Sequence, residues 1–203
     1  MRKQLSFLKT KLIEAVNLLP FNSSVIGTPR KCSAVAPYLK IHPEVSVHLL
    51  TEEQDIVLSR PVLNNQRFAE CYATARATPA QYILELSHAR VWGANGAVIT
   101  KDDTFLNDVS REFGIKDCCN DHSVFHNISL IPKKYIEGNI AVIATAGANV
   151  YYHWMLDVLP RLLFLKEASM FDKIDYFIVN HKSLPFQKQT LSKIDHLKTG
   201  SPS

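Results

Sequence analysis

The stretch Asn149-Val-Tyr-Tyr-His-Trp-Met-Leu-Asp-Val-Leu-Pro-Arg-Leu-Leu-Phe-Leu-Lys166 combines a helical pattern of apolar residues with a row of reactive side chains. The apolar residues recur at intervals of three and four, which predicts a helix over 150–167 with one buried face. They are Val150, Trp154, Met155, Val158, Leu159, Leu162 and Leu163. His153, Asp157 and Arg161 follow one another at steps of four. Each step advances about 40° around an α-helix, so their side chains form one slanting stripe.

This stripe has the residue types of a proton-transfer site. A carboxylate one turn from an imidazole can orient the ring and raise its basicity, so His153 and Asp157 are candidates for a general base unit. Arg161 can bind a phosphate or an acidic sugar, because a guanidinium forms paired bonds to oxyanions. The structural alternative is a solvated ladder of ion pairs in which Arg161 pairs with Asp157 and anchors the helix. Pro160 removes the backbone bond to the Leu156 carbonyl and is expected to strain or kink the helix.

A short apolar run precedes the helix. Asn139-Ile-Ala-Val-Ile-Ala-Thr145 is typical of a buried strand, so the helix is expected to begin at the carboxyl end of that strand. Ligands of open α/β sheets bind at this edge. Gly147 and Asn149 are expected to shape the turn and to offer backbone donors to an oxygen-rich ligand. Tyr152 is a candidate wall of a ligand groove, whereas Trp154 is interpreted as a core residue.

A second apolar run, Asp175-Tyr-Phe-Ile-Val179, follows the helix and completes a strand, helix, strand unit. Such a unit predicts two parallel strands joined by a crossover helix. Another helix is expected to begin near Leu184. The sequence therefore predicts an α/β fold in its last third.

The segment 149–162 resembles the signature of the family 61 glycosyltransferases, whose bacterial members are often labelled capsular polysaccharide biosynthesis proteins. The shared pattern is a His-Trp, a following Asp and a Pro-Arg. Ala89-Arg-Val-Trp-Gly-Ala-Asn-Gly-Ala-Val-Ile-Thr100 is similar to the Gly-rich hairpin of that family, and Asp108-Val-Ser110 follows it. The resemblance runs from about residue 79 to residue 192.

The resemblance implies an inverting, metal-independent transferase of the GT-B arrangement, with two facing α/β domains and no cofactor beside its substrates. Its expected partners are a nucleotide-sugar donor and a glycan or lipid-linked acceptor in surface or capsular polysaccharide synthesis. His153 and Asp157 would act as one unit that removes the acceptor proton during displacement at the anomeric carbon, and either residue could be the base. The expected substrate-binding residues are Arg161, Asn149, Gly147 and Tyr152. The chain contains no Asp-x-Asp pair, which favours a metal-free site.

The chain of 203 residues is long enough for one domain or slightly more. We expect a basic amphipathic helix and linker in 1–40, a β-rich segment with hairpins in 41–135, and a Rossmann-like strand, helix, strand unit in 136–203. The polar, aperiodic end of the chain predicts that it is the amino-terminal half of a longer or split GT-B-like enzyme. The alternative is a truncated, catalytically inactive acceptor-binding domain that lacks the donor half.

Basic residues are concentrated in the first forty positions, where seven Lys and Arg face Glu14 alone. Apolar residues spaced for one face predict a basic amphipathic helix over 4–19, which either packs on its own domain or docks to an anionic membrane surface. Nucleic acid is not an expected partner, because no basic stripe with interleaved aromatics recurs later. No apolar run is long enough to span a membrane, and no signal peptide is recognisable. We expect a cytoplasmic protein, with peripheral contact to the inner membrane face as an option.

Short β-branched segments alternate with turn signals between residues 45 and 106. Strands are expected at 45–50, 56–64, 81–86, 89–92 and 97–100. Asn95-Gly96 predicts a hairpin, because both residues accept a positive φ, and Lys101-Asp-Asp-Thr104 predicts a second turn. The segment 21–42 is rich in Ser, Pro and Lys, which predicts a loop or linker.

Four cysteines lack the spacing of a small disulfide-bonded domain, so we expect reduced thiols. They are Cys32, Cys71, Cys118 and Cys119. Cys118, Cys119, His122 and His126 resemble zinc-ligand spacing. The segment after His122 reads as extended chain without the rigid knuckle of a closed site, so no metal site is expected. Motifs for NAD, ATP and a nucleophilic serine are also missing.

Overall fold

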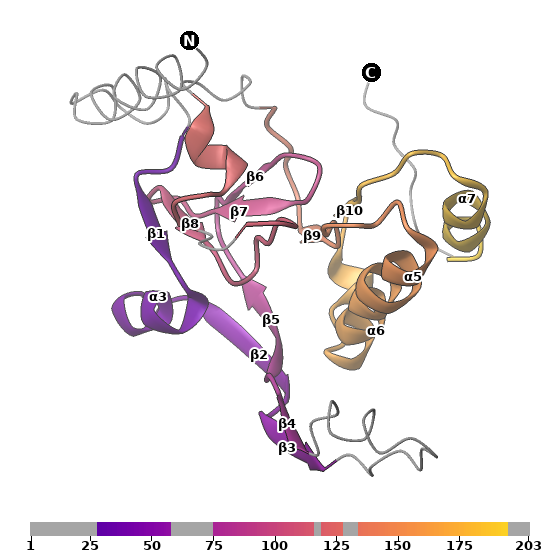
Figure 1. Cartoon of the computed structure of the whole chain (residues 1–203), viewed down its shortest axis with the longest axis horizontal. Coiled ribbons are helices and arrows are strands. Elements are labelled where there is room, and N and C mark those ends of the chain that lie inside the picture. The colour runs from indigo at the N-terminus through magenta and orange to yellow at the C-terminus, as the bar shows by residue number, and fades with distance from the viewer. Residues whose placement is uncertain (1–27, 58–74, 116–118, 128–133, 195–203) are drawn as a thin grey trace, which may run out of the picture. The chain divides into compact units, whose positions relative to one another are not determined.

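The computed structural model describes residues 28–57, 75–115, 119–127 and 134–194 (Figure 1). The amphipathic helix expected over 4–19 and the polar end of the chain lie outside these residues. The fold is mixed α/β, as expected. By its contacts the chain forms two compact units, of which the smaller is Ser46–Glu85 and the larger is Met1–Val45 with Leu86–Ser203. The segments expected from composition, 1–40, 41–135 and 136–203, stay a prediction.

The larger unit contains a four-stranded sheet in the order β1-β8-β7-β6. Its strands are β1 (Lys31–Ser33), β8 (Thr104–Leu106), β7 (Ala97–Ile99) and β6 (Arg90–Trp92). The three consecutive strands pair antiparallel, while β1 joins β8 in parallel. Ala97, Ile99 and Phe105 are buried on this sheet together with Val124, and they form one of its two hydrophobic cores.

The predicted hairpin between β6 and β7 is confirmed, although its backbone differs from the prediction. The positive φ angles fall at Gly93 (71°) and Gly96 (73°), not at Asn95. A Cβ on Gly96 would lie 2.9 Å from the Cβ of Ala144, so this glycine is also required by close packing. The second turn is confirmed as well, and Asp103 adopts its left-handed position (φ 64°).

The loop or linker expected over 21–42 is wrong for its last part. The chain there forms β1 and the helix α3 (Val35–Ile41). The local sequence predicts neither β1 nor α3, because both elements are stabilised by residues far along the chain. The Asp108 carboxylate accepts hydrogen bonds from the Val35 amide at 2.9 and 3.1 Å and so satisfies a donor at the start of α3.

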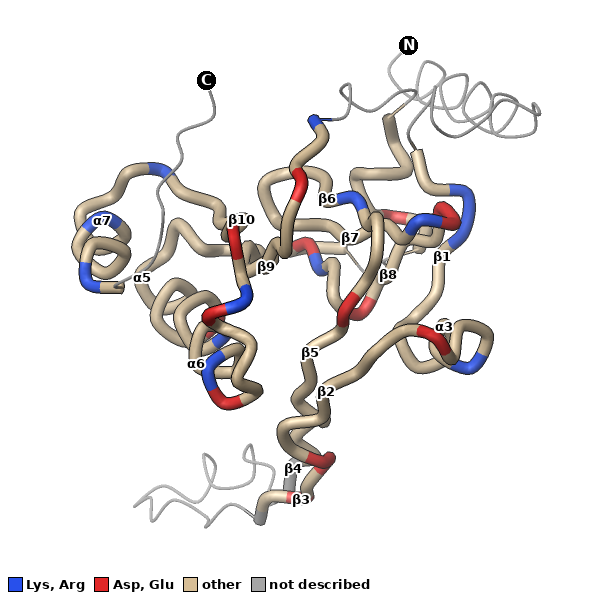
Figure 2. The backbone as a smooth tube through the Cα atoms, turned by 180° about the vertical axis from the view of Figure 1, so that it is seen from behind, with Lys and Arg blue, Asp and Glu red and all other residues tan. Residues whose placement is uncertain are grey.

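Asp102 organises the turn between β7 and β8. Its carboxylate accepts hydrogen bonds from the hydroxyls of Thr100 (2.6 Å), Thr104 (2.9 Å) and Tyr38 (3.0 Å). Burial by itself would raise the pKa of Asp102, but these hydroxyl donors outweigh it and hold the pKa far below its usual value. Lys31 lies 3.5 Å from the same carboxylate. Figure 2 shows the acidic and basic residues that gather around β1 and β8.

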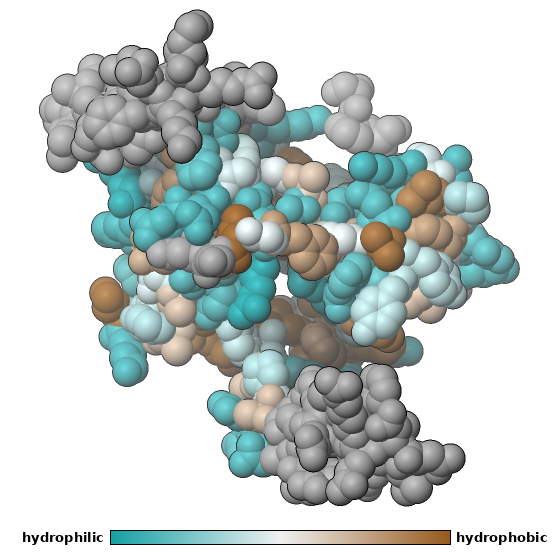
Figure 3. Space-filling view, in the orientation of Figure 1, coloured by the Kyte–Doolittle hydropathy of each residue, from teal (hydrophilic) through white to brown (hydrophobic). Residues whose placement is uncertain are grey.

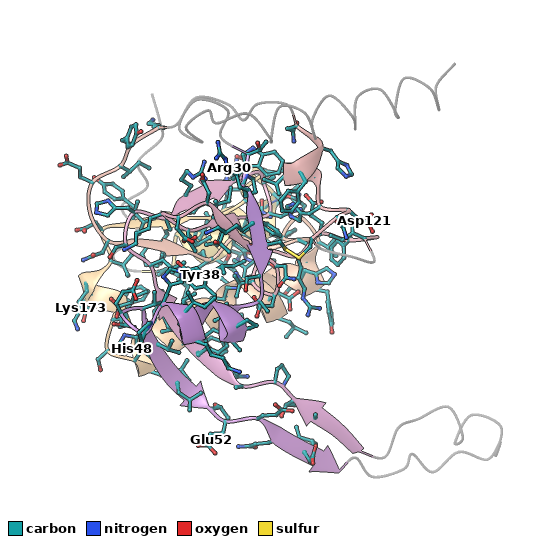
Figure 4. All side chains as sticks on the ribbon, turned by 90° about the vertical axis from the view of Figure 1, so that its left-hand side faces the viewer. Arg30, Tyr38, His48, Glu52, Asp121 and Lys173 are labelled. Carbon is teal, nitrogen blue, oxygen red and sulfur yellow. A yellow bond between two sulfur atoms is a disulfide. The ribbon has the colours of Figure 1, made fainter. Side chains whose placement is uncertain are left out.

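The expectation of reduced thiols is wrong for two of the four cysteines. Cys32 in β1 and Cys119 form a disulfide, with their Cα atoms 5.6 Å apart (the yellow bond in Figure 4). The two residues are 87 positions apart, so sequence spacing gave no indication of the pair. Cys71 and Cys118 lie outside the described residues. The bond fastens the segment that carries Cys119 to the edge strand of the sheet.

The predicted strand, helix, strand unit is confirmed. Strand β9 (Ile140–Val142) pairs in parallel with β10 (Tyr176–Ile178), and the crossover runs through the helical residues Tyr151–Glu167. The short helix η3 (Phe171–Lys173) precedes β10, and α7 (Pro185–Leu191) follows it. The second hydrophobic core lies here and consists of Ile143, Ala148, Trp154, Val158 and Leu162.

The smaller unit consists of two antiparallel pairs of strands. Strand β2 (Ser46–Thr51) pairs with β5 (Gln81–Glu85), and β3 (Gln54–Val57) pairs with β4 (Ala75–Thr78). The strands expected at 45–50 and 81–86 are confirmed. The strand expected at 56–64 overlaps β3 at residues 56–57, and the rest of it lies outside the described residues. No described helix has both the length and the apolar character needed to cross a membrane.

Candidate functional site

The turn between β9 and the crossover helix places the candidate residues at the carboxyl end of β9. Gly147 has a φ of 80°, and the Val150 amide donates to its carbonyl at 2.8 Å. A Cβ on Gly147 would lie 2.8 Å from both the His153 ring and the Phe113 ring. Glycine is therefore needed here for the backbone conformation and for the approach of two aromatic side chains.

The crossover helix changes its winding at the candidate site. It runs as α5 (Tyr151–His153), a π-helical segment η2 (Trp154–Val158) and α6 (Leu159–Glu167). In the π segment the Leu159 amide donates to the Trp154 carbonyl five positions earlier. Pro160 follows directly, so the strain predicted at this proline appears as a widened turn. π-helical turns are rare and frequently occur at functional sites.

His153 and Asp157 form a hydrogen-bonded pair. The distance between His153 Nδ1 and Asp157 Oδ2 is 2.6 Å, and the two side chains are 29% and 43% exposed. In the neutral tautomer that donates from Nδ1 to the carboxylate, Nε2 has a free lone pair. None of the described residues hydrogen-bonds Nε2. The pair is thus arranged as a carboxylate-oriented imidazole that solvent and small ligands can reach.

Arg161 does not extend this pair into the ion-pair ladder that the sequence left open. Its Nη1 donates to the carbonyl oxygen of Ala144 at 3.0 Å, and the described residues contain no direct ion pair between Arg161 and Asp157. Burial lowers the pKa of Arg161, and the charge of Asp157 opposes this effect. The guanidinium therefore ties the helix to the end of β9 close to the His153 and Asp157 pair.

Asn149 and Tyr152 occupy different environments. The Oδ1 atom of Asn149 is buried and has no hydrogen-bond partner among the described residues. An unsatisfied buried acceptor costs free energy, so a donor from a ligand would complete it. Tyr152 is 63% exposed, and its ring meets that of His153 edge-on at 5.4 Å between centroids.

The predicted buried face of the crossover helix is only partly correct. Trp154 is fully buried, as expected for a core residue, and its Nε1 donates to Thr190 Oγ1 at 2.8 Å. Val150 and Leu163, in contrast, are exposed, together with Leu156. Figure 3 shows apolar atoms at the surface of the part of the molecule that contains α5 and α6. Val150 has extended backbone and precedes the helix, whereas Leu163 follows the π-helical segment, which shifts the α-helical register of the residues after it.

Phe113 also belongs to this site, although it was not among the residues predicted from the sequence. Its ring lies 5.3 Å from that of His153, and it also approaches Gly147. Phe113 is 66% exposed and belongs to the loop after β8. Its position as an aromatic residue in a loop indicates a packing partner elsewhere. The local sequence does not show that this partner is a helix about forty positions later.

In the structure, the described cysteine and histidine residues whose spacing resembles a zinc site make other contacts. Cys119 is bonded to Cys32, so it offers no thiolate to a metal. His126 Nε2 contacts the carbonyl oxygen of Asn120 at 3.2 Å. Among the described residues no group of His, Cys, Asp and Glu is arranged for metal binding.

Comparison with known proteins adds no relative. The chain shows no match to a family model, to a curated protein or to a solved structure. Function is therefore inferred from the chemistry of the site and from the resemblance of its motif.

Proposed function

We propose that this chain belongs to a glycosyltransferase that moves a sugar from a nucleotide-sugar donor to a hydroxyl of a glycan or lipid-linked acceptor. The single observation that carries the proposal is the 2.6 Å contact between His153 Nδ1 and Asp157 Oδ2 at the carboxyl end of β9. The motif that contains both residues resembles that of the family 61 transferases. The proposed substrate class is taken from this resemblance. In its complete form, the proposal is that the enzyme is inverting and metal-independent, has the GT-B arrangement and acts in surface polysaccharide synthesis.

In the proposed reaction His153 is the base and Asp157 orients it. The lone pair of His153 Nε2 takes the proton of the acceptor hydroxyl while its oxygen bonds to the anomeric carbon. The bond between that carbon and the diphosphate oxygen breaks, and the nucleoside diphosphate leaves with the electron pair. Asp157 stabilises the imidazolium formed in this step, because its carboxylate already holds Nδ1–H.

The neighbouring residues have separate roles in the proposal. The buried Oδ1 of Asn149 accepts a hydrogen bond from a substrate hydroxyl. The Arg161 guanidinium, with Nη1 bound to the Ala144 carbonyl, supplies the positive charge that offsets the developing phosphate charge in this proposal. Gly147 leaves room for the His153 ring itself, and Tyr152 forms an exposed wall beside that ring.

The test is nucleotide release and sugar transfer by the purified chain. Nucleotide sugars with different bases and sugars are supplied with mixed glycan acceptors, and ³¹P NMR follows the appearance of nucleoside diphosphate. We expect release that depends on an acceptor and disappears in His153→Gln. Glu167→Gln, which changes an exposed charge on the same helix, is the matched control and should retain activity.

Two outcomes would argue against this proposal. Glycan binding without any nucleotide release would indicate an acceptor-binding domain without catalysis. Equal release by wild type and His153→Gln would remove this histidine from the chemistry.

A further inference from the structure

A pocket of about 210 Å³ lies beside the turn between β6 and β7, away from the His153 and Asp157 pair. It is lined by Trp92, Gly93, Ala94, Asn95, Ala97, Glu112, His122 and Ser123. Gly93 and Ala94 are exposed, so the pocket is reachable from solvent. Pockets for drug-sized ligands measure about 300–1,000 Å³. This one is therefore suited to a single small ring.

His122 supplies an unsatisfied donor to this pocket. The side chain is 1% exposed, and its Nδ1 accepts a hydrogen bond from the Val124 amide at 3.1 Å. Nδ1 is thus unprotonated, and the proton of the neutral ring lies on Nε2. Nε2 is buried and has no hydrogen-bond partner among the described residues. A buried N–H without a partner is costly, so an acceptor supplied from the pocket would lower the free energy of this arrangement.

Glu112 supplies an acceptor next to this donor. Its Oε1 lies 3.6 Å from His122 Nε2, which is too far for a direct hydrogen bond. Its carboxylate accepts from the amide (3.0 Å) and from the hydroxyl of Ser123. Burial raises the pKa of Glu112, but the two bonds from Ser123 outweigh this and lower it. The ionised carboxylate has further lone pairs for a donor from the pocket.

These groups select one class of ligand. An anion would be repelled by Glu112, and a cation would meet the Nε2–H donor of His122. A purely apolar ring would leave the Nε2–H donor of His122 without an acceptor. A hydroxyl satisfies both, because it accepts from Nε2–H and donates to the carboxylate. Trp92 adds an aromatic surface against which the C–H face of a ring can pack.

We propose that this pocket binds one ring of a neutral polyhydroxylated ligand, a monosaccharide unit, with a hydroxyl between His122 Nε2 and Glu112. The inference does not depend on the transferase proposal, since it concerns binding without turnover. Glu112 lines the pocket, and the next residue along the chain, Phe113, contacts the His153 ring.

The experiment uses the full chain and four probes, the methyl glycosides of glucose, galactose, mannose and xylose. Saturation-transfer NMR detects binding, and acrylamide quenching of tryptophan fluorescence locates it. The chain has two tryptophans, and Trp154 is fully buried, so protection from quenching reports on Trp92. We expect at least one probe to bind with a dissociation constant on the order of 1 mM and to protect Trp92.

His122→Asn is the sharpest variant. The asparagine oxygen can keep the hydrogen bond from the Val124 amide that caps η1 (Ser123–His126), while the Nε2 donor is lost. We expect the affinity for the bound probe to fall by about tenfold or more. His126→Asn changes an exposed histidine of the same short helix and should leave the affinity unchanged.

Trp92→Leu tests the aromatic wall and is also expected to weaken binding about tenfold. If His122→Asn does not fold, the Trp92→Leu variant alone is used to test the proposal. The proposal is overturned if no probe binds wild type, which would indicate a pocket filled by water only. It is equally overturned if affinity is unchanged in both folded pocket variants.

Discussion

Gly147 leaves the space that the imidazole of His153 occupies. A Cβ at position 147 would lie 2.8 Å from His153 Cδ2, and the backbone there has a φ of 80°. The residue that begins the turn after β9 therefore determines where the proposed base can lie. Two effects are combined at this position, the backbone strain of a left-handed residue and a steric clash with the ring.

Gly147→Ala should destabilise the protein by about 1–3 kcal/mol and displace the His153 ring. Gly114→Ala is the matched control, because Gly114 has nearly the same φ (78°) but no atom within 4 Å of a built Cβ. Urea unfolding of both variants separates strain from clash. Equal losses of stability in the two variants would show that the ring relaxes without cost.

Asp157→Asn should lower the proposed transfer rate by about 10²–10⁴-fold, because an amide cannot stabilise the imidazolium of His153. The side chain is 43% exposed, so its pair with His153 contributes little to folding, within about 1 kcal/mol. Single-turnover transfer and thermal unfolding measure the two effects separately. Full activity in Asp157→Asn would exclude the orienting role.

Asn149→Ala should leave the stability unchanged or raise it by up to about 1 kcal/mol, because it removes a buried acceptor without a partner among the described residues. The same change should weaken substrate binding if Oδ1 accepts from a substrate hydroxyl. Thermal unfolding with and without nucleotide sugar and acceptor compares the two readouts. A clear loss of stability in the free variant would instead assign Asn149 a structural bond.

The carboxylate of Asp102 should make stability depend on pH in the acid range. Its pKa is lowered in the folded state, so its contribution is complete above the usual value of 3.8 and is lost as pH falls below it. Asp102→Asn should cost about 1–3 kcal/mol at pH 7 and progressively less toward pH 2. Urea unfolding at several pH values measures this difference. Asp172→Asn, an exposed carboxylate, is the control, and a constant difference across pH would contradict the prediction.

Reduction of the bond between Cys32 and Cys119 should destabilise the larger unit. The bond closes a loop across 87 positions, and removing such a crosslink is expected to cost about 2–5 kcal/mol. Denaturant unfolding of wild type and of Cys32→Ser, each with and without dithiothreitol, tests this. The reductant should shift only wild type. Peptide mapping under non-reducing conditions should recover residues 32 and 119 in one linked peptide, and a link from Cys32 to Cys118 would correct the pairing.

Elements with a strong local pattern were predictable. The apolar runs before and after the crossover helix predicted β9 and β10 and their parallel pairing, and Asn95-Gly96 predicted the hairpin between β6 and β7. His153 and Asp157 were recognised because a spacing of four brings two side chains together within one helix. These features depend on residues close together in the chain. They can be predicted because helices and strands repeat with fixed periods that are visible in the sequence.

The sequence by itself thus determined the strand, helix, strand unit and the pairing of His153 with Asp157. Only the tertiary structure decided that β1 pairs with β8, that Cys32 meets Cys119, and that Phe113 packs on His153. It also decided that Nε2 of His122 is buried beside Glu112. The physical reason is that these contacts join segments far apart in the chain. Which segments meet depends on side-chain packing and on the free energy of loop closure, and neither produces a periodic pattern in the sequence.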